Sequence, residues 1–191
     1  MASLPTRIVL CGPNMVGKTQ VSMMWAGLRD TPAVKYDPTK NLRIVETTAI
    51  ADDEPINLQI WDLSGEASAV NNFILVRKAV HGAVIVLNPN NPGCVDSLAF
   101  WYQKIVDGAI PHSSCFILWL TKDTETADLP HLPALFASMA SYQTNLAPER
   151  LDSLRGVLND FAGRVSAAAE AKLRSEETTL LMSPVGSFRA D

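Results

Sequence analysis

Short apolar segments alternate along the chain with longer segments in which apolar residues recur at helical spacing. The short segments are rich in β-branched residues, as buried strands are. They predict strands over residues 7–11, 42–50, 56–61, 83–88, 115–121 and 140–144. The longer segments predict helices over residues 18–28, 67–79, 95–107, 132–139 and 148–172.

The order of these segments predicts the fold class. Strands and helices alternate except at residues 52–55, Asp-Asp-Glu-Pro, which read as a polar hairpin turn between the second and third strands. Parallel strands need helical crossovers, whereas a tight turn joins antiparallel ones. We therefore expect an α/β fold: a six-stranded, mostly parallel sheet with one antiparallel strand and helices on both faces.

Composition limits the classes of protein that fit. The chain has 191 residues, of which 47% are hydrophobic and 19% charged, as expected for one globular α/β domain with a modest tail. The net charge of −4 and the absence of a basic run do not suggest a nucleic-acid-binding or anionic membrane surface. Cys11, Cys94 and Cys115 are odd in number and far apart, which favours a reducing cytosol over a disulfide framework.

The chain carries no sequence pattern for membrane attachment. No apolar run reaches the roughly 18 residues of a membrane span, and the first residues do not form a signal peptide. The last residues lack a cysteine for prenylation, and Met1-Ala2 lacks the glycine needed for myristoylation. We expect no direct membrane anchor.

Residues 12–19 read Gly-Pro-Asn-Met-Val-Gly-Lys-Thr, the phosphate-binding loop of P-loop proteins, placed between a predicted strand and a predicted helix. Glycines let successive backbone N–H groups point at phosphate oxygens. Lys18 should reach the β- and γ-phosphates, and the Thr19 hydroxyl should ligate Mg²⁺. The residues expected to contact the nucleotide here are Gly12, Asn14, Met15, Val16, Gly17, Lys18, Thr19 and Gln20.

Two further motifs complete a candidate γ-phosphate site. Trp61-Asp62-Leu63-Ser64-Gly65 begins 43 residues after Lys18 and ends the third predicted strand, so that Asp62 is placed to hold Mg²⁺ and Gly65 to bring its N–H to the γ-phosphate. Tyr36-Asp37-Pro38-Thr39 lies in the loop before the second strand, where Thr39 is a second candidate Mg²⁺ ligand. A loop held in this way is ordered by GTP and released by GDP. The spacing is that of Ras-type GTPases rather than nucleotide kinases.

These motifs resemble the small GTPases over about residues 5–171, and this range is the expected G domain, followed by a tail over residues 172–191. Residues 36–44, residues 81–88, Trp101-Tyr102 and residues 176–183 resemble the Rab-like small GTPase subunit of intraflagellar transport complex B. The resemblance implies GTP or GDP and Mg²⁺ as cofactors and coiled-coil subunits of that complex as partners. It also implies a location in the cytoplasm and at the cilium or flagellum and its base. The tail is either a flexible end or a segment that orders on a partner.

The chain departs from a hydrolysing GTPase at three places. Glu66 follows Gly65, where hydrolysing relatives carry a glutamine that orients the attacking water. Asn14 puts a side chain where many relatives have a small residue. The base-reading motif is altered: Thr121-Lys122-Asp123-Thr124 keeps the lysine, while Asp123 stands one residue early and either reads the base or faces solvent.

The sequence therefore favours a GTP-binding adaptor subunit that hydrolyses GTP very slowly, with Glu66 at the water-positioning site and no confident catalytic residue. Lys122 and Asp123 are candidate base contacts, and residues 142–146 are the expected last base-contacting loop. One alternative is an active switch whose hydrolysis a partner stimulates. A P-loop kinase for a small molecule is a third possibility, disfavoured because no arginine-rich lid is evident.

Overall fold

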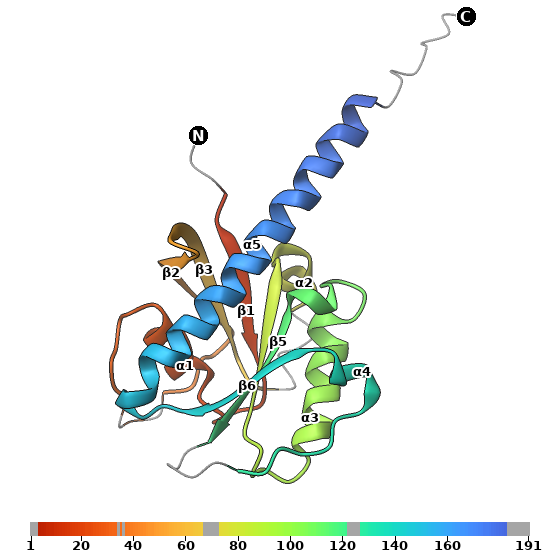
Figure 1. The fold of residues 1–191 in the computed structure, drawn as a ribbon. Coiled ribbons are helices and arrows are strands. Elements are labelled where there is room, and N and C mark those ends of the chain that lie inside the picture. Colours follow the sequence, from red (N-terminus) through yellow and green to blue (C-terminus); the bar gives the residue numbers. More distant parts are fainter. Residues whose placement is uncertain (1–3, 34, 36, 67–72, 122–126, 183–191) are drawn as a thin grey trace, which may run out of the picture.

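A computed structural model of the chain describes residues 4–33, 35, 37–66, 73–121 and 127–182. Its single sheet has six strands in the order β2-β3-β1-β4-β5-β6 (Figure 1). The strands are β1 (Thr6–Cys11), β2 (Leu42–Ala51), β3 (Glu54–Leu63), β4 (Gly82–Leu87), β5 (Cys115–Thr121) and β6 (Ala140–Asn145). Only β2 and β3 pair antiparallel, and the other neighbours are parallel. The predicted fold class is confirmed.

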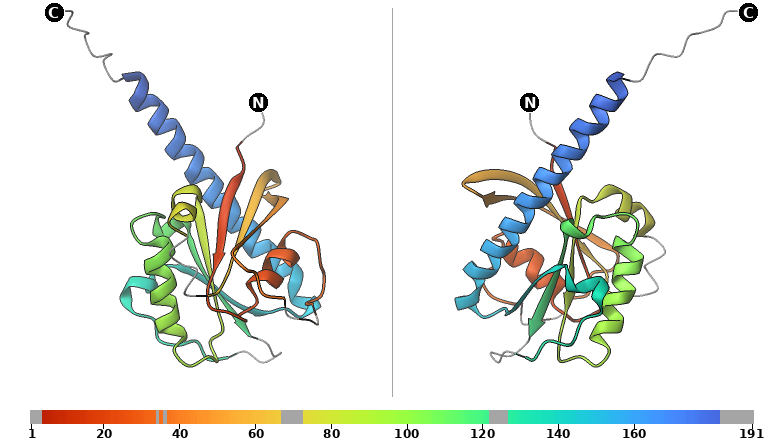
Figure 2. Two further views of the ribbon diagram at one scale, coloured as in Figure 1. Left: turned by 180° about the vertical axis from the view of Figure 1, so that it is seen from behind. Right: turned by 45° about the vertical axis from the view of Figure 1, so that its right-hand side comes forward.

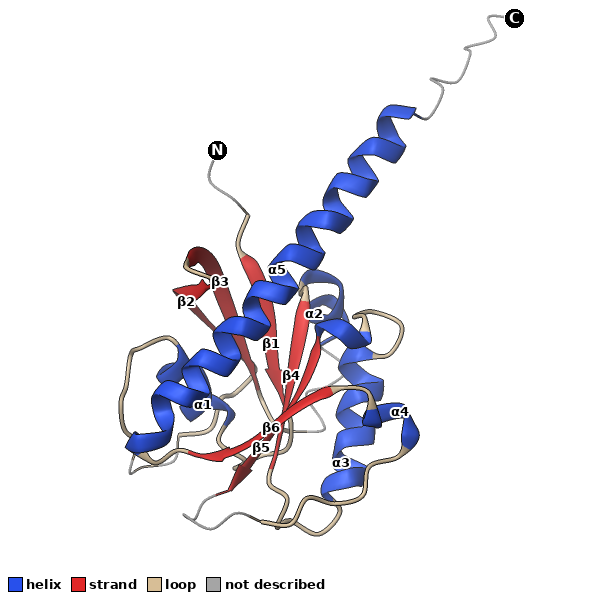
Figure 3. Cartoon of the chain, in the orientation of Figure 1, coloured by secondary structure: helices blue, strands red, loops and turns tan. Residues whose placement is uncertain are grey.

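Helices cover both faces of the sheet, as Figure 3 shows by element type. The helices are α1 (Lys18–Trp25), α2 (Ile74–Ala79), α3 (Cys94–Trp101), α4 (Ala134–Ala137) and α5 (Leu151–Met182). Successive residues of the central strands belong to different cores: Val9 and Ile85 pack on the side of α2, α3 and α4, while Ile8 and Val84 pack on the side of α1 and α5. A strand buried on both faces has to be apolar throughout, which is why β4 and β5 read as continuous apolar runs.

The β2–β3 hairpin closes with a two-residue turn. Asp52 and Asp53 have φ of 50° and 63°, and Ala51 pairs with Glu54. Positive φ at both central residues matches the right-handed twist of the strands, and Asp tolerates this conformation better than most residues. The hairpin expected at residues 52–55 is confirmed, with strands longer than predicted.

Helix bounds differ from the predictions in places where proline or local bonding intervenes. Residues 132–139 were expected to be helical, but α4 covers only Ala134–Ala137 because Pro133 precedes it in an extended conformation. The helix expected over residues 95–107 continues from α3 as a π-helical turn, Tyr102–Val106. Of the helix expected over residues 67–79, α2 forms the end, and residues 67–72 lie outside the described part.

The last helix is longer than predicted. The spacing predicts its end at residue 172, but α5 continues to Met182 and leaves the body of the protein (Figure 2). Phe161 and Leu158 are fully buried, whereas residues 170–181 are all exposed. Pairs of opposite charge one turn apart, such as Glu170 with Arg174, support the exposed part locally. The boundary of the G domain at residue 171 stays a prediction.

Polar contacts hold α5 against α1. The Trp25 indole donates to Asn159 Oδ1 at 2.9 Å, and the Arg155 guanidinium donates to Met24 O at 2.8 Å and to Asp30 Oδ1 at 2.8 Å. These bonds place α1, and with it the loop before α1, at the carboxyl edge of the sheet. Cys11, Cys94 and Cys115 are all buried and form no disulfide bond.

Candidate nucleotide-binding site

The loop between β1 and α1 is shaped by two glycines. Gly12 has φ of 142°, and a Cβ there would lie 2.1 Å from Val86 O. Gly17 has φ of 96°, and a Cβ there would lie 2.6 Å from the Leu120 side chain. Both the backbone angles and the close neighbours exclude larger residues. The loop therefore curls tightly against β4 and β5 and leads directly into the first turn of α1.

Lys18 is drawn into this curl. Its side chain is only 6% exposed, and Nζ donates to Gly12 O at 2.9 Å and to Pro13 O at 2.7 Å. Burial lowers the pKa of Lys18 to about 8, while the nearby Asp62 carboxylate acts in the opposite direction. An anion beside Lys18 would favour the charged form of its side chain and raise the pKa again, so the site is electrostatically suited to phosphate.

Three side chains from separate segments meet beside Lys18. Asp62, at the end of β3, accepts hydrogen bonds at Oδ2 from Thr19 Oγ1 at 2.7 Å and from Thr39 Oγ1 at 2.9 Å. The two threonine hydroxyl oxygens are 3.0 Å apart. Neighbouring ligands of an octahedral Mg²⁺ with bonds near 2.1 Å are about 3.0 Å apart. The two hydroxyl groups thus have the spacing of adjacent Mg²⁺ ligands.

The Asp62 carboxylate has unused bonding capacity. The residue is fully buried, and its Oδ1 has no hydrogen-bond partner among the described residues. Burial raises the pKa of Asp62, and the hydrogen bonds from Thr19 and Thr39 oppose that rise. A buried carboxylate oxygen without a donor calls for an ion or an ordered water. The residues present fit a Mg²⁺ ion, whose water ligands would donate to Oδ1.

The turn after β3 touches the phosphate-binding loop. A Cβ at Gly65 would lie 2.4 Å from Asn14 N and 2.5 Å from Pro13 C, so only glycine fits this approach. Glu66 is exposed, and its N–H donates to Ser64 Oγ at 3.3 Å. Its side chain does not line the pocket at the carboxyl edge of the sheet. The water-positioning role expected at Glu66 stays a prediction.

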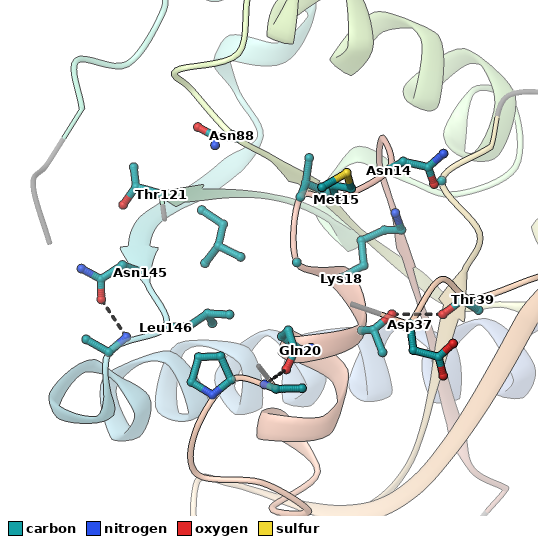
Figure 4. A pocket seen from close by; sticks show the side chains of 18 of the residues that line it. Asn14, Met15, Lys18, Gln20, Asp37, Thr39, Asn88, Thr121, Asn145 and Leu146 are labelled. Atoms are coloured by element: carbon teal, nitrogen blue, oxygen red, sulfur yellow. Dashed lines mark hydrogen bonds between the residues drawn. The ribbon is translucent and has the colours of Figure 1, made fainter. Parts of the chain in front are cut away.

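A pocket of about 700 Å³ runs along the carboxyl edge of the sheet, from the phosphate-binding loop to the end of β6 (Figure 4). This volume is typical of small-ligand sites. The predicted residues that line it are Asn14, Met15, Val16, Gly17, Lys18, Thr19, Gln20, Thr39 and Gly65. Gly12 and Asp62 do not line the pocket, but each contacts a residue that does: Gly12 O accepts from Lys18 Nζ, and Asp62 Oδ2 accepts from Thr19 Oγ1. Lys122 and Asp123 lie outside the described residues.

The far end of the pocket was only partly expected. Of residues 142–146, Asn145 and Leu146 line it, whereas Tyr142 packs toward α5 and Gln143 Nε2 donates to Ala127 O at 2.7 Å. Asn145 Oδ1 accepts from Ala147 N at 2.9 Å, which forms a tight turn facing the pocket.

Several lining residues were missed: Pro32, Ala33, Asp37, Leu63, Asn88, Leu120, Thr121, Ala147 and Pro148. Asn88 had a usable signal, since it is a polar residue directly after the apolar strand β4 at the edge where ligands bind. Ala33 had none: its N–H donates to Gln20 Oε1 at 2.8 Å, and only the folded chain shows that this bond ties the loop to α1.

The fold and the site together define a Ras-like P-loop GTPase domain. The chain belongs to the Roc family of such domains: the pattern of the family described as "Ras of Complex, Roc, domain of DAPkinase" matches residues 7–123.

Known proteins similar to the chain include intraflagellar transport proteins. "Intraflagellar transport protein 22" of Trypanosoma brucei brucei is 29% identical over 109 residues, about half of each chain (51% of this one and 50% of that one). The homolog from Danio rerio is 21% identical over 183 residues, which cover 92% of this chain and 97% of that protein.

A solved structure, "T. brucei IFT22/74/81 GTP-bound crystal structure", matches with a TM-score of 0.63 and 27% identity over 86% of this chain and 99% of that one. The predicted resemblance to the intraflagellar transport branch of the small GTPases is thereby confirmed.

Among the described residues, no helix is both long and apolar enough to cross a bilayer. Within the same part of the chain, no three His, Cys, Asp or Glu side chains cluster so as to hold a metal by themselves. A Mg²⁺ ion at Thr19 and Thr39 would therefore depend on nucleotide oxygens for further ligands, as is usual for this ion.

The low pKa of Lys18 has a measurable consequence. The unfolded chain, with a lysine pKa near 10.5, binds this proton more tightly than the folded, nucleotide-free protein does. The free energy of unfolding therefore rises as pH increases from about 8 toward 10.5, and the cost of burying the ammonium group is fully present below pH 8. Between pH 7.5 and pH 9.5 the gain should be on the order of 1–2 kcal/mol.

Urea unfolding of nucleotide-free wild type and Lys18→Met at several pH values measures this gain. The variant should lack it, and Lys104→Met, at an exposed position, should keep it. Equal pH dependence of wild type and Lys18→Met would contradict the assignment.

Proposed function

We propose that the protein is a GTP-binding subunit of intraflagellar transport complex B, acting in the assembly of cilia or flagella and binding its nucleotide with Mg²⁺. The observation that carries this proposal is that Thr19 and Thr39 meet at the Asp62 carboxylate, and that both threonines line one pocket together with Lys18. Phosphate, a divalent cation and the loop that carries Thr39 would all be bound at this point.

The nucleotide proposal follows from the chemistry of the pocket. Backbone N–H groups of the loop at residues 12–17 and the start of α1 attract phosphate, and the buried ammonium group of Lys18 adds a full charge. Thr39 reaches the pocket from a loop outside the sheet, so its position can depend on whether a γ-phosphate is present. Such a site distinguishes GTP from GDP.

The base proposal is guanine. The turn at Asn145–Ala147 faces the far end of the pocket, where the backbone N–H of Leu146 would meet the guanine O6, since the Ala147 N–H is already bonded to Asn145 Oδ1. Asp123 is the candidate carboxylate for a contact to the base. Guanine is favoured over adenine by membership in the Ras-like family and by the Ras-type motif spacing.

The partner proposal rests on similar proteins. One matching solved structure is the GTP-bound IFT22/74/81 structure from T. brucei, and similar known proteins are intraflagellar transport proteins. We propose that this chain binds coiled-coil subunits of the same complex and resides in the cytoplasm and at the cilium or flagellum and its base.

The proposed role is that of an adaptor with very slow hydrolysis. A carboxylate at Glu66 accepts hydrogen bonds but lacks the amide donor that orients water toward the γ-phosphate, and it adds negative charge beside a strongly anionic group. Each 1.4 kcal/mol added to the barrier slows the reaction about tenfold. Holding GTP rather than cleaving it then keeps the loop of Thr39 ordered.

Purification from flagellated cells tests the proposed function. Tagged protein should carry GTP or GDP, detected by ion-exchange chromatography of the heat-released nucleotide, and should bring other intraflagellar transport subunits with it. Lys18→Ala should lose the nucleotide, because it removes the buried charge that the phosphates need. Lys104→Ala, which also removes one lysine but at an exposed helix position, should retain it.

Absence of nucleotide from the wild type, together with no thermal stabilisation by GTP and Mg²⁺, would refute nucleotide binding. Nucleotide without any co-purifying transport subunit would refute the adaptor role alone.

Glu66→Gln should raise the single-turnover rate of GTP hydrolysis about tenfold or more, since it restores a donor to the water-positioning site. Glu54→Gln, in the distant hairpin, is the matched control and should leave the rate unchanged. Phosphate release is measured after addition of Mg²⁺ to GTP-loaded protein. Fast hydrolysis by the wild type would overturn the slow-adaptor proposal. A large, partner-stimulated rate that is lost in Glu66→Ala would establish the switch enzyme instead.

A further inference from the structure

A second hollow lies at the opposite edge of the sheet from the nucleotide pocket. It has a volume of about 1230 Å³, and its lining includes Thr6, the first residue of β1, and His81, which precedes β4. The strands therefore run from this groove toward the nucleotide pocket. Figures 1 and 2 show the start of β1 and the helix α2 beside α5, where α5 begins to leave the body.

The groove carries cations without matching carboxylates. Within it, Arg174 pairs with Glu170 at 2.9 Å and Lys172 with Glu176 at 3.9 Å along α5 itself. The other lining cations are Arg7, Arg77 and Lys78. Among the described residues none of these three forms an ion pair. The groove thus has an excess of positive charge in a protein whose net charge is −4.

Arg7 and His81, which also line the groove, lie side by side and have no acidic partner among the described residues. Their side chains face each other, with Arg7 Nη2 3.1 Å from His81 Nε2, and Arg7 Nε is buried without an acceptor among the described residues. Burial lowers the pKa of His81, and the charges of Arg7 and Lys172 lower it further. A buried donor without an acceptor next to clustered cations is a place where carboxylates would be stabilised.

The groove is also apolar. Leu4, Ile74 and Leu173 line it and are 77%, 61% and 45% exposed. Large apolar side chains that gather at the surface in this way are typical of a binding site. They come from three segments: the start of the chain, α2 and the projecting part of α5. Arg77 donates to the main-chain oxygen of Asp107, but it has no acidic partner among the described residues. Apolar side chains next to cations that lack acidic partners form a surface that is complementary to one acidic, amphipathic element.

We propose that this groove binds an acidic amphipathic helix of a partner protein. The helix would lie along the projecting part of α5, with aliphatic side chains against Leu4, Ile74 and Leu173 and carboxylates toward Arg7, Arg77 and Lys78. Because the groove is at the far edge of the sheet from Thr39 and Gly65, the interaction does not depend on which nucleotide is bound.

An anionic bilayer fits the groove less well than a helix does. A bilayer is flat, whereas the cations line a hollow between α2 and α5. A single helix can enter between the two walls and keep its own polar face in water.

The test uses the full chain and a fluorescein-labelled, stapled peptide of about three heptads with leucines on one face and glutamates beside them. Fluorescence anisotropy should show saturable binding that weakens with salt and is equal with GDP and with a non-hydrolysable GTP analogue. A peptide with lysines in place of the glutamates should not bind. Vesicles containing phosphatidylserine are tested in parallel.

Matched variants separate the groove from the rest of the surface. Lys78→Glu should weaken binding about tenfold, whereas Arg29→Glu, the same charge change at another exposed site, should not. Leu173→Ser should weaken it similarly, whereas Leu181→Ser, further along α5 and outside the groove, should not. Because Lys78 is also in the last turn of α2, thermal unfolding of each variant identifies any loss of fold.

No saturable peptide binding, equal weakening by Lys78→Glu and Arg29→Glu, or vesicle binding without peptide binding would overturn the proposal. The inference rests on the proposed function only in that a subunit of an assembly needs a partner surface. Nucleotide binding and peptide binding are measured separately, so that either can fail alone.

Discussion

The nucleotide site depends on one buried carboxylate. Asp62 ends β3 in the interior and accepts hydrogen bonds from Thr19 at the start of α1 and from Thr39 in the loop before β2. A helix, a loop and a strand that are distant in sequence are thereby joined at a single atom, Oδ2. Burial of this charge is costly on its own. The ammonium group of Lys18 and the hydroxyl groups of Thr19 and Thr39 offset that cost and thus define the site.

The parallel sheet explains why these groups meet. In a doubly covered sheet the carboxyl ends of the strands share one edge, and loops leaving that edge converge. Gly12, Gly17 and Gly65 let the loops approach more closely than any side chain would allow. At the opposite edge, the start of β1, the end of α2 and the projecting α5 leave the cationic, apolar groove. Nucleotide and partner helix would then be bound at separate ends of one rigid sheet.

Much of this was predictable from the sequence, for physical reasons. The central strands are buried on both faces and so read as apolar runs, and the phosphate-binding loop needs glycines at fixed positions. The turn at Gly65 was predictable because its distance from Lys18 along the chain is typical of Ras-type proteins.

The rest depended on contacts that leave no local pattern. Ala33 reaches the pocket beside a bond from its N–H to Gln20, and Tyr142 packs against the core while Asn145 and Leu146 line the pocket. The length of α5 was missed because its exposed part is stabilised by charge pairs along the helix rather than by an apolar face.

The central claim is that Thr19, Thr39 and Asp62 form a Mg²⁺ site that is completed by a γ-phosphate. Isothermal titration with GDP and with a non-hydrolysable GTP analogue, with and without Mg²⁺, tests it most directly. Mg²⁺ should tighten binding of the GTP analogue at least about tenfold more than binding of GDP, and Thr39→Ala should remove this difference while GDP binding is kept. An equal effect of Mg²⁺ on both nucleotides, or no change in Thr39→Ala, would contradict the account.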